Sequence, residues 1–508
     1  MEHIVEMLHI RKEFPGVVAC DDVTLQLRQG EIHALLGENG AGKSTLMGIL
    51  FGMNRPDRGE VRVRGRVVDI ANPNVACALG IGMVHQHFKL VHNFTVTENI
   101  VLGQEPKIAG VMLRLGPAAQ RVRDISKQYG LSVDPDARIE DISVGTQQRV
   151  EILKMLYRNA EVLIFDEPTA VLTPQEIQGF MQILRNLKAE GKSILLITHK
   201  LKEIKEVADR CTVLRRGKLV GTVEVAQSSE ADMARMMVGR DVLFSVAKQP
   251  REPGETVLQV DNLTVLNNRK LPGLKGFSLQ VRAGEIVAVA GIEGNGQSEL
   301  VEAITGLRRA ESGSVHLKGR QITRDPVRAR IRAGMAHIPE DRHKHGLVLD
   351  YSVEDNLILE TYDQNPYAIR GLLQRDAIRQ HADKVMADFD VRAGRGAETP
   401  VRSMSGGNQQ KAIVGREIDL NPDLLIAVQP TRGLDVGAIE YIHRRLVEQR
   451  DNGRAVLLIS LELDEVLDVA DRVAVVCRGE LVGIVNAQET NENEIGLMMA
   501  GTGREQGA

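Results

Sequence analysis

Short, nearly continuous apolar runs alternate along the chain with longer segments of helical pattern. Residues 31–36, 161–165 and 193–197 read EIHALL, EVLIF and SILLI, and residues 46–50 continue as an apolar helix after a glycine-rich loop. Apolar runs of this length, separated by helices, are typical of parallel strands whose sheet is covered on both faces. The pattern therefore predicts an α/β fold.

The same pattern occurs twice. Residues 28–32 (RQGEI) recur at 282–286 (RAGEI), which is an offset of 254 in a chain of 508 residues. Residues 216–221 (RGKLVG) recur at 478–483 (RGELVG) with an offset of 262. Several matches in the same order, with so small a drift in offset, indicate a duplicated domain.

A polar segment separates the two copies. Residues 248–255 (KQPREPGE) contain two prolines and show no apolar periodicity, as expected of a linker. We therefore predict a first domain at residues 1–245, a linker at 246–256 and a second domain at 257–508.

Composition excludes several classes of protein. The formal net charge is −4, which argues against broad attraction to nucleic acid or anionic lipid. The chain has no Trp and only 6 Tyr and 9 Phe, so aromatic platforms for single-stranded nucleic acid are not expected. Its four cysteines are far apart, which indicates neither a zinc site nor a disulfide framework. No signal-peptide pattern or apolar run of ~18 residues is visible, so we expect a soluble protein that does not insert into membranes.

A phosphate-binding loop is predicted in the first half. Residues 37–44 (GENGAGKS) match the pattern G-x-x-x-x-G-K-[ST] between a predicted strand and a predicted helix. The glycines allow backbone N–H groups to converge on phosphate oxygens at the positive end of a helix. Lys43 adds a charge for the β- and γ-phosphates, and the Ser44 hydroxyl is a ligand for Mg²⁺.

Further polar residues follow two of the predicted strands. Asp166 and Glu167 end the strand at 161–165, at the edge of a parallel sheet where ligands bind. Asp166 would orient the magnesium shell, and Glu167 would polarise the attacking water as a general base. The pair could instead cap the next helix. His199 follows the strand at 193–197, where it could hold the water and the γ-phosphate.

Together these motifs resemble the nucleotide-binding domains of ABC transporters over essentially the whole chain. The resemblance implies a parallel-sheet core with an antiparallel β subdomain in each half, and a helical subdomain such as residues 88–145. It assigns ATP binding to Phe14, Gly37, Asn39, Gly40, Ala41, Gly42, Lys43, Ser44, Thr45, Ser405, Gly406 and Gly407. It assigns catalysis to Lys43, Gln86, Glu167 and His199, and magnesium to Ser44, Gln86 and Asp166. Judged alone, Phe14 would more readily be a core residue.

Two signature motifs, at residues 142–148 (ISVGTQQ) and 404–410 (MSGGNQQ), complete the resemblance. In the family, each ATP lies between one domain's phosphate loop and the signature motif of the other domain. The resemblance thus pairs the Lys43 loop with the regular motif at 404–410. It pairs the second loop with the motif at 142–148, which departs from the family pattern at Val144 and Thr146.

The second half lacks most of the catalytic side chains. Lys43, Asp166, Glu167, His199 and Gln86 are matched by other residues, so the charged phosphate ligand, the carboxylate pair and the histidine are gone: Gln297, Val428, Gln429, Leu461 and Glu340. No aromatic residue matches Phe14. Asp435 lies in the second half where the first has Thr173, so this acid also belongs with the intact site. We therefore predict one hydrolytic ATP site and one degenerate ATP site.

The family implies partners as well as chemistry. A tandem chain with a degenerate second half resembles the ATPase subunit of bacterial importers for simple sugars. Residues 83–88 (MVHQHF) and 427–437 (AVQPTRGLDVG) resemble the nucleoside-importing branch most closely. We therefore expect ATP and Mg²⁺, permease subunits, indirectly a solute-binding protein, and a place on the cytoplasmic face of the membrane. Import of a ribose- or galactose-type sugar is the alternative, and a non-transport tandem ATPase is a more distant one.

Overall fold

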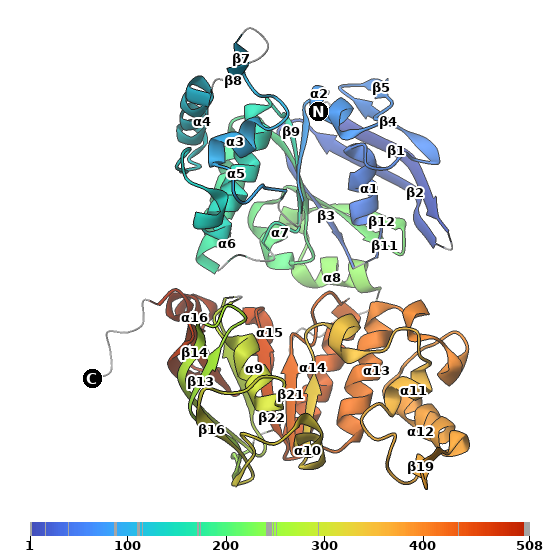
Figure 1. Cartoon of the computed structure of the whole chain (residues 1–508). Coiled ribbons are helices and arrows are strands. Elements are labelled where there is room, and N and C mark those ends of the chain that lie inside the picture. The colour runs from blue at the N-terminus through green and yellow to red at the C-terminus, as the bar shows by residue number, and fades with distance from the viewer. Residues whose placement is uncertain are drawn as a thin grey trace. The chain divides into compact units, whose positions relative to one another are not determined.

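The computed structural model describes residues 3–15, 17–38, 40–85, 89–108, 112–113, 115–169, 172, 174–239, 246, 248–249, 251–292, 294–434 and 436–501. The chain forms two compact units, Met1–Val242 and Leu243–Ala508 (Figure 1). Each unit contains the same two principal sheets.

A six-stranded sheet forms the centre of the first unit, in the order β12-β11-β3-β10-β9-β6. These strands are β12 (Lys218–Glu224), β11 (Arg210–Arg215), β3 (Ile32–Gly37), β10 (Ser193–Ile197), β9 (Val162–Asp166) and β6 (Ile81–Val84). All neighbouring pairs are parallel except β11 with β12. The three strands predicted from apolar runs are β3, β9 and β10, with bounds within one residue of those expected.

Both faces of this sheet are buried. Leu163 and Phe165 of β9 pack into one hydrophobic cluster, and Val162 and Ile164 pack into another. Consecutive strand residues point to opposite faces, so a strand covered on both sides needs an unbroken apolar run. This explains why the sequence shows continuous rather than alternating hydrophobicity.

An antiparallel sheet and one group of helices cover the two faces (Figure 1). The sheet has the order β2-β1-β4-β5, formed by β1 (His3–Phe14), β2 (Val17–Arg28), β4 (Arg58–Val63) and β5 (Arg66–Val68). The helical subdomain contains α3 (Val96–Val101), α4 (Leu115–Tyr129) and α5 (Val144–Tyr157), with the small hairpin of β7 (Lys107–Ile108) and β8 (Met112–Leu113). The remaining helices are α1 (Lys43–Leu50), α2 (Pro73–Ala78), α6 (Pro174–Ala189), α7 (Leu201–Val207) and α8 (Glu230–Val238).

The second unit repeats this topology strand for strand. Its central sheet has the order β18-β21-β22-β15-β23-β24, and its antiparallel sheet has the order β14-β13-β16-β17. The strands are β13 (Thr256–Leu266), β14 (Pro272–Arg282), β15 (Ile286–Ala290), β16 (Ser312–Leu317), β17 (Arg320–Gln321), β18 (Met335–Ile338), β21 (Leu424–Val428), β22 (Ala455–Ser460), β23 (Arg472–Cys477) and β24 (Glu480–Asn486). The predicted α/β fold and its duplication are confirmed.

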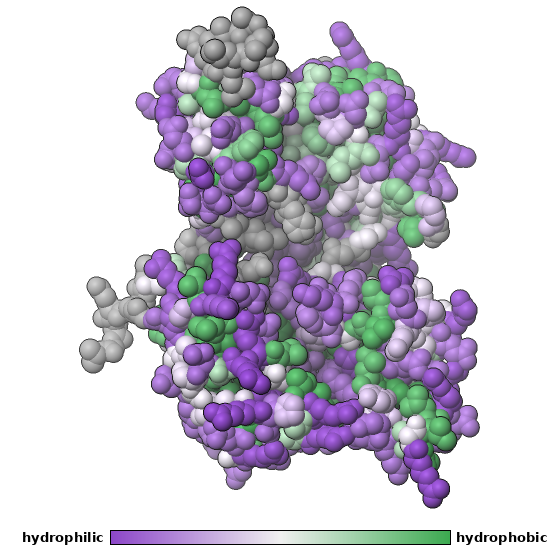
Figure 2. Space-filling view, viewed as in Figure 1, coloured by the Kyte–Doolittle hydropathy of each residue, from purple (hydrophilic) through white to green (hydrophobic). Residues whose placement is uncertain are grey.

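The helices of the second unit also match those of the first. They are α9 (Gln297–Thr305), α10 (Val327–Arg332), α11 (Val353–Leu357), α12 (Arg375–Asp388), α13 (Gly406–Asp419), α14 (Val436–Asp451), α15 (Leu463–Val469) and α16 (Glu492–Met499). A hairpin of β19 (Ala368–Ile369) and β20 (Leu372–Leu373) precedes α12, as β7 and β8 precede α4. Apolar atoms gather on the surface near β19 (Figure 2), where Ile369 and Leu372 are exposed.

Candidate functional site

The phosphate-binding loop runs from the end of β3 to the start of α1. Gly42 precedes α1 with a left-handed backbone, at a φ of 99°. A Cβ atom at this position would lie 2.3 Å from the carbonyl oxygen of Ala19 on β2. Only glycine therefore allows the loop to turn into the helix while packing against β2. Asn39, which the sequence also assigns to ATP binding, lies outside the described residues.

Lys43 is buried at the base of this loop. Its Nζ atom donates hydrogen bonds to the carbonyl oxygens of Gly37, at 2.7 Å, and Glu38, at 3.0 Å. Burial lowers the pKa of Lys43, and the charges of Glu167 and Asp166 oppose that effect. The ammonium group is therefore held inside the loop by carbonyl oxygens and nearby carboxylates, where the phosphates of a nucleotide are expected.

Ser44 and Asp166 meet beside Lys43. Asp166 is the last residue of β9, and the Ser44 hydroxyl is hydrogen-bonded to its carboxylate. Burial and the charge of Glu167 raise the pKa of Asp166, whereas Ser44 and Lys43 lower it. A hydroxyl and a carboxylate oxygen are the kind of protein ligands that Mg²⁺ accepts when phosphates complete its shell. The side chains therefore fit the predicted ion.

Glu167 is held in an uncommon backbone conformation directly after β9. Its φ is 46°, and its N–H donates to the carbonyl oxygen of Ile197 at 3.0 Å. Its Oε1 atom lies 3.3 Å from Nδ1 of His199. This hydrogen bond is the largest contribution to a lowered pKa of Glu167, with burial acting in the opposite direction. The carboxylate therefore stays ionised, as a general base requires.

The remaining first-half candidates lie around this centre. Phe14 ends β1 with 41% of its surface exposed, and the Nζ atom of Lys12 lies 5.5 Å from its ring centroid. Its partner on β2 is Val17, and Ala19 further along β2 contacts the phosphate loop. Phe14 is therefore an exposed aromatic near the loop and not a core residue. Gln86 lies outside the described residues, just after β6.

Both signature motifs begin helices of 14 residues. Ser405 caps α13 by accepting a hydrogen bond from the N–H of Asn408 at 3.4 Å, and Ser143 caps α5 by accepting one from Thr146 at 3.3 Å. Both serines are exposed. Each motif therefore presents a helix N-terminus to solvent, the arrangement that favours an anionic ligand.

The second unit keeps the backbone of the site without its chemistry. Gly296 has a φ of 104°, and a Cβ atom there would lie 2.6 Å from the carbonyl oxygen of Gly273. Gln429 has a φ of 47°, and its N–H donates to the carbonyl oxygen of Ile459 at 2.7 Å. Gln297 replaces the lysine, and its buried Nε2 atom has no hydrogen-bond partner among the described residues.

A family model described as "ABC transporter" matches residues 20–170 and 274–432. The chain belongs to the ABC transporter family. The family predicted from the motifs is therefore confirmed, and with it the class of ABC-type ATPase.

Two relatives of this family are similar over nearly their whole length. The chain is 56% identical to the guanosine import ATP-binding protein NupO of Bacillus subtilis (strain 168), covering 99% of this chain and 98% of that protein. It is 55% identical to the nucleoside import ATP-binding protein NupA of Lactococcus lactis subsp. cremoris (strain MG1363), covering 98% of each. The resemblance to the nucleoside-importing branch is confirmed. A ribose import ATP-binding protein of Rubrobacter xylanophilus (strain DSM 9941 / JCM 11954 / NBRC 16129 / PRD-1) is 42% identical, over 99% of both chains.

A solved structure supports the fold alone. The complex of archaeal ribosomal stalk protein aP1 with ribosome recycling factor aABCE1 contains a chain that aligns with 97% of this one, at a TM-score of 0.62 and 16% identity. The alignment covers 92% of that chain.

The sequence did not predict one ion pair that lies near the candidate ATP site of the second unit. Arg432 donates to the carboxylate of Glu340, the residue that replaces Gln86. Nη1 of Arg342 also donates to the carbonyl oxygen of Arg432 at 3.3 Å. The residues are about 90 positions apart, and only the pairing of β18 with β21 brings their strand ends together. The residue that matches Gln86 is thus a glutamate whose carboxylate is paired with an arginine of the same unit.

Two classes of feature are absent from the part of the chain that the structure describes. It contains no helix that is both long and apolar enough to span a membrane. It also contains no group of three or more His, Cys, Asp or Glu residues arranged to hold a metal ion.

Proposed function

We propose that this chain is the ATPase subunit of an ABC importer and that it energises uptake of a nucleoside. The observation that carries the catalytic part is the contact between Glu167 and His199 beside the Lys43 loop. The names of the relatives at 55–56% identity support the nucleoside.

We assign the roles of the first site as follows. The backbone of the loop and Lys43 bind the phosphates of ATP, and Ser44 and Asp166 hold Mg²⁺, with Gln86 predicted to join them. The ion, when bound, neutralises charge on the phosphates. Glu167 accepts a proton from the attacking water, and His199 orients that carboxylate. The pairing of this site with the helix N-terminus at Ser405, Gly406 and Gly407 stays a prediction of the family resemblance.

The decisive experiment compares the two residues that share one backbone conformation. Glu167→Gln should abolish ATP turnover, because an amide cannot accept the proton, whereas Gln429→Ala should leave most of it. Turnover is measured as phosphate release by the full chain with its permease subunits. Comparable losses in the two variants would contradict a single hydrolytic site.

The solute is tested in the assembled importer. Guanosine should stimulate ATP turnover, and be taken up, in proteoliposomes that contain the permease and a solute-binding protein. Ribose is the matched alternative, because ribose import proteins are also relatives of this chain. Turnover stimulated by ribose and not by guanosine would replace the nucleoside with a monosaccharide.

A groove on the first unit is the surface we assign to the permease. It encloses about 180 Å³ beside the edge strand β6, and its lining includes Phe51, Cys77, Met83, His85 and Lys154. We propose that a cytoplasmic helix of the permease docks here, which places the chain on the cytoplasmic face of the membrane.

Cysteine labelling tests this docking surface. Cys77 and Cys477 are partly exposed, whereas Cys20 and Cys211 are buried. Assembly with the permease should protect Cys77 from a maleimide reagent, while Cys477 of the second unit serves as the matched control. Unchanged labelling of Cys77 in the assembled importer would place the permease elsewhere.

A further inference from the structure

A buried carboxylate lies directly behind the Glu167–His199 contact. Glu203 is on α7, and only 5% of its surface is exposed. Its Oε1 atom accepts a hydrogen bond from the Thr169 hydroxyl at 2.6 Å, and its Oε2 atom accepts one from the Thr198 hydroxyl at 3.1 Å. Both threonines are themselves buried. Each oxygen of one carboxylate therefore holds a different segment of the chain.

These two segments carry the catalytic residues. Thr169 follows Glu167 by two positions after β9, and Thr198 immediately precedes His199 after β10. The Thr198 hydroxyl also accepts a hydrogen bond from the N–H of Lys200 at 3.0 Å, which fixes its orientation. Burial raises the pKa of Glu203, while the charge of Lys200 and the two hydroxyls lower it. Glu203 thus links the strand end that bears the base to the strand end that bears the histidine.

The second unit keeps only half of this link. Glu465 stands at the matching position, 262 residues further along, and still accepts from Thr431 at 2.9 Å. Its Oε2 atom has no hydrogen-bond partner among the described residues. Ser460, which matches Thr198, is directed instead to the carbonyl oxygen of Glu462 at 3.5 Å. The lost half is the one that leads to the position of the histidine, where this unit has Leu461.

We infer that Glu203 is a positioning residue for hydrolysis, which keeps His199 in register with Glu167 through Thr169 and Thr198. Its two hydrogen bonds go to Thr169 and Thr198, so it acts through the loops that carry Glu167 and His199. The inference rests on the proposed roles of Glu167 and His199. Small errors in the position of a catalytic group can cost about 100-fold in rate, so a short hydrogen-bonded link can matter greatly.

The first test removes the Thr198 half of the link in one variant and changes the shared carboxylate in another, in both cases without a large change in volume. Thr198→Val and Glu203→Gln should lower the kcat for ATP by about 10- to 100-fold. The KM for ATP should change little, because the Lys43 loop is untouched. Thr198→Ser keeps the hydroxyl and should restore most of the turnover. Glu465→Gln in the second unit is the matched control and should keep wild-type turnover.

The outcomes separate this inference from the proposed function. Wild-type kcat in Thr198→Val, or equal losses in Glu203→Gln and Glu465→Gln, would overturn the positioning role. If Glu203→Gln does not fold, as judged by its melting temperature, the Thr198→Val and Thr198→Ser pair decides alone. Persistent turnover in Glu167→Gln would instead show that the proposed hydrolytic site is wrong.

Discussion

Glu167 and Gln429 occupy the same left-handed backbone position, with φ values of 46° and 47°, at the ends of equivalent strands. Such a conformation costs of the order of 1 kcal/mol for a residue other than glycine, so the surrounding structure must impose it. In the first unit it aims a carboxylate at His199. The second unit retains the backbone and replaces the carboxylate with an amide. The duplicate thus separates the scaffold of the site from its chemistry.

Because the second unit keeps the backbone of the phosphate loop, one side chain should partly restore nucleotide binding there. Gln297 is as deeply buried as Lys43, with 6% of either residue exposed. Replacing Gln297 with Lys should raise the ATP affinity of the second unit by about tenfold, as expected for one charged hydrogen bond. Titration calorimetry on a chain that also carries Lys43→Ala reports this unit separately. An unchanged affinity would show that the missing lysine does not limit nucleotide binding in the second unit.

Most of this site could be predicted from the sequence because its residues lie in short motifs. Lys43 and Ser44 belong to one loop, and the positions of Asp166 and His199 follow from the ends of apolar strands. Glu203 could not be found in this way, because its partners lie up to 34 residues away and a buried glutamate in a helix has no local signature. The same is true of Arg432 and Glu340, which only the parallel pairing of two strands brings together.

A second residue-scale prediction concerns a buried histidine. Burial, with His345 and Arg416 nearby, lowers the pKa of His337 from 6.5 to about 4. Below pH 6.5 the unfolded chain binds a proton at His337 that the folded unit does not bind, so the free energy of unfolding falls as the pH drops. His337→Met places at this position the residue that the first unit has there, Met83. Between about pH 7 and about pH 5, the wild type should lose about 2 kcal/mol more of its free energy of unfolding than the variant does.

Urea unfolding of the wild type and the variant at the two pH values measures this difference. Glu360 lies in the same region, and burial together with Glu417 raises its pKa to about 7. Its protonation stabilises the folded unit as the pH falls, which is the opposite sense, so only the difference between the two chains isolates His337. Parallel pH curves would mean that folding does not lower the pKa of His337.

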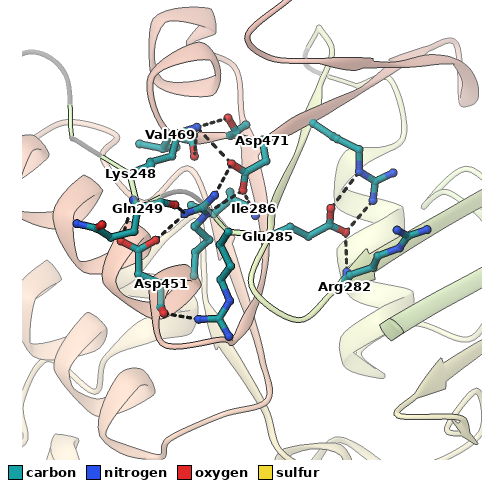
Figure 3. Close-up of polar contacts among 12 residues, drawn as sticks. Lys248, Gln249, Arg282, Glu285, Ile286, Asp451, Val469 and Asp471 are labelled. Atoms are coloured by element: carbon teal, nitrogen blue, oxygen red, sulfur yellow. Dashed lines mark hydrogen bonds and ion pairs between the residues drawn. The ribbon is translucent and has the colours of Figure 1, made fainter. Parts of the chain in front are cut away.

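At the scale of elements, a polar network fastens the start of the second unit to its own helices (Figure 3). Asp471 accepts the N–H of Ile286 at 2.8 Å and the guanidinium of Arg450 at 3.1 Å and 3.2 Å. Nζ of Lys248 lies 3.5 Å from the same carboxylate. Arg450 also donates to the carbonyl oxygen of Gln249 at 2.6 Å. Lys248 and Gln249, which belong to the predicted linker, are therefore held against the second unit.

The first unit contains a simpler version of this network, which supplies a matched control. Asp209 accepts the N–H of Ile32 at 2.9 Å, but its cation is Lys188, whose side chain is 36% exposed against 7% for Arg450. Asp471→Asn should lower the free energy of unfolding by about 3 kcal/mol, because it removes a negative charge that neutralises the buried guanidinium of Arg450. Asp209→Asn should cost less than about 1 kcal/mol, because its ion pair is exposed. Urea denaturation compares them, and equal losses would contradict the argument.

Element boundaries show what the hydrophobic pattern can and cannot reveal. The strand at 193–197 was predicted with its observed bounds, because a buried parallel strand is apolar throughout. The hairpin of β19 and β20 was not predicted. Its strands have two residues each, which is too short for any periodicity, and Leu372 is 72% exposed. The turn between such short exposed strands determines where they form, and burial in a core does not. The hydrophobic pattern therefore carries no information about them.

At the scale of the whole molecule, each unit contains its own pair of hydrophobic clusters. Those of the first unit are built from residues between Ile4 and Leu214, and those of the second from residues at and beyond Val246. Each unit therefore has a core of its own, as a duplicated domain requires. A ligand that binds only folded protein should consequently stabilise the two units to different degrees, according to how tightly each one binds it.

The absence of tryptophan from the sequence makes this difference measurable. Tyr129→Trp and Tyr441→Trp place single reporters against the cores of the first and second units, respectively. With Glu167→Gln present to prevent turnover, MgATP at ~100 times its Kd should stabilise the first unit by about 2.7 kcal/mol. The Tyr441→Trp reporter should shift less, because Gln297 and Val428 offer the nucleotide neither a charge nor a magnesium ligand. Equal shifts in the two melting curves would show that the second site binds ATP as tightly as the first, and that its degeneracy affects hydrolysis alone.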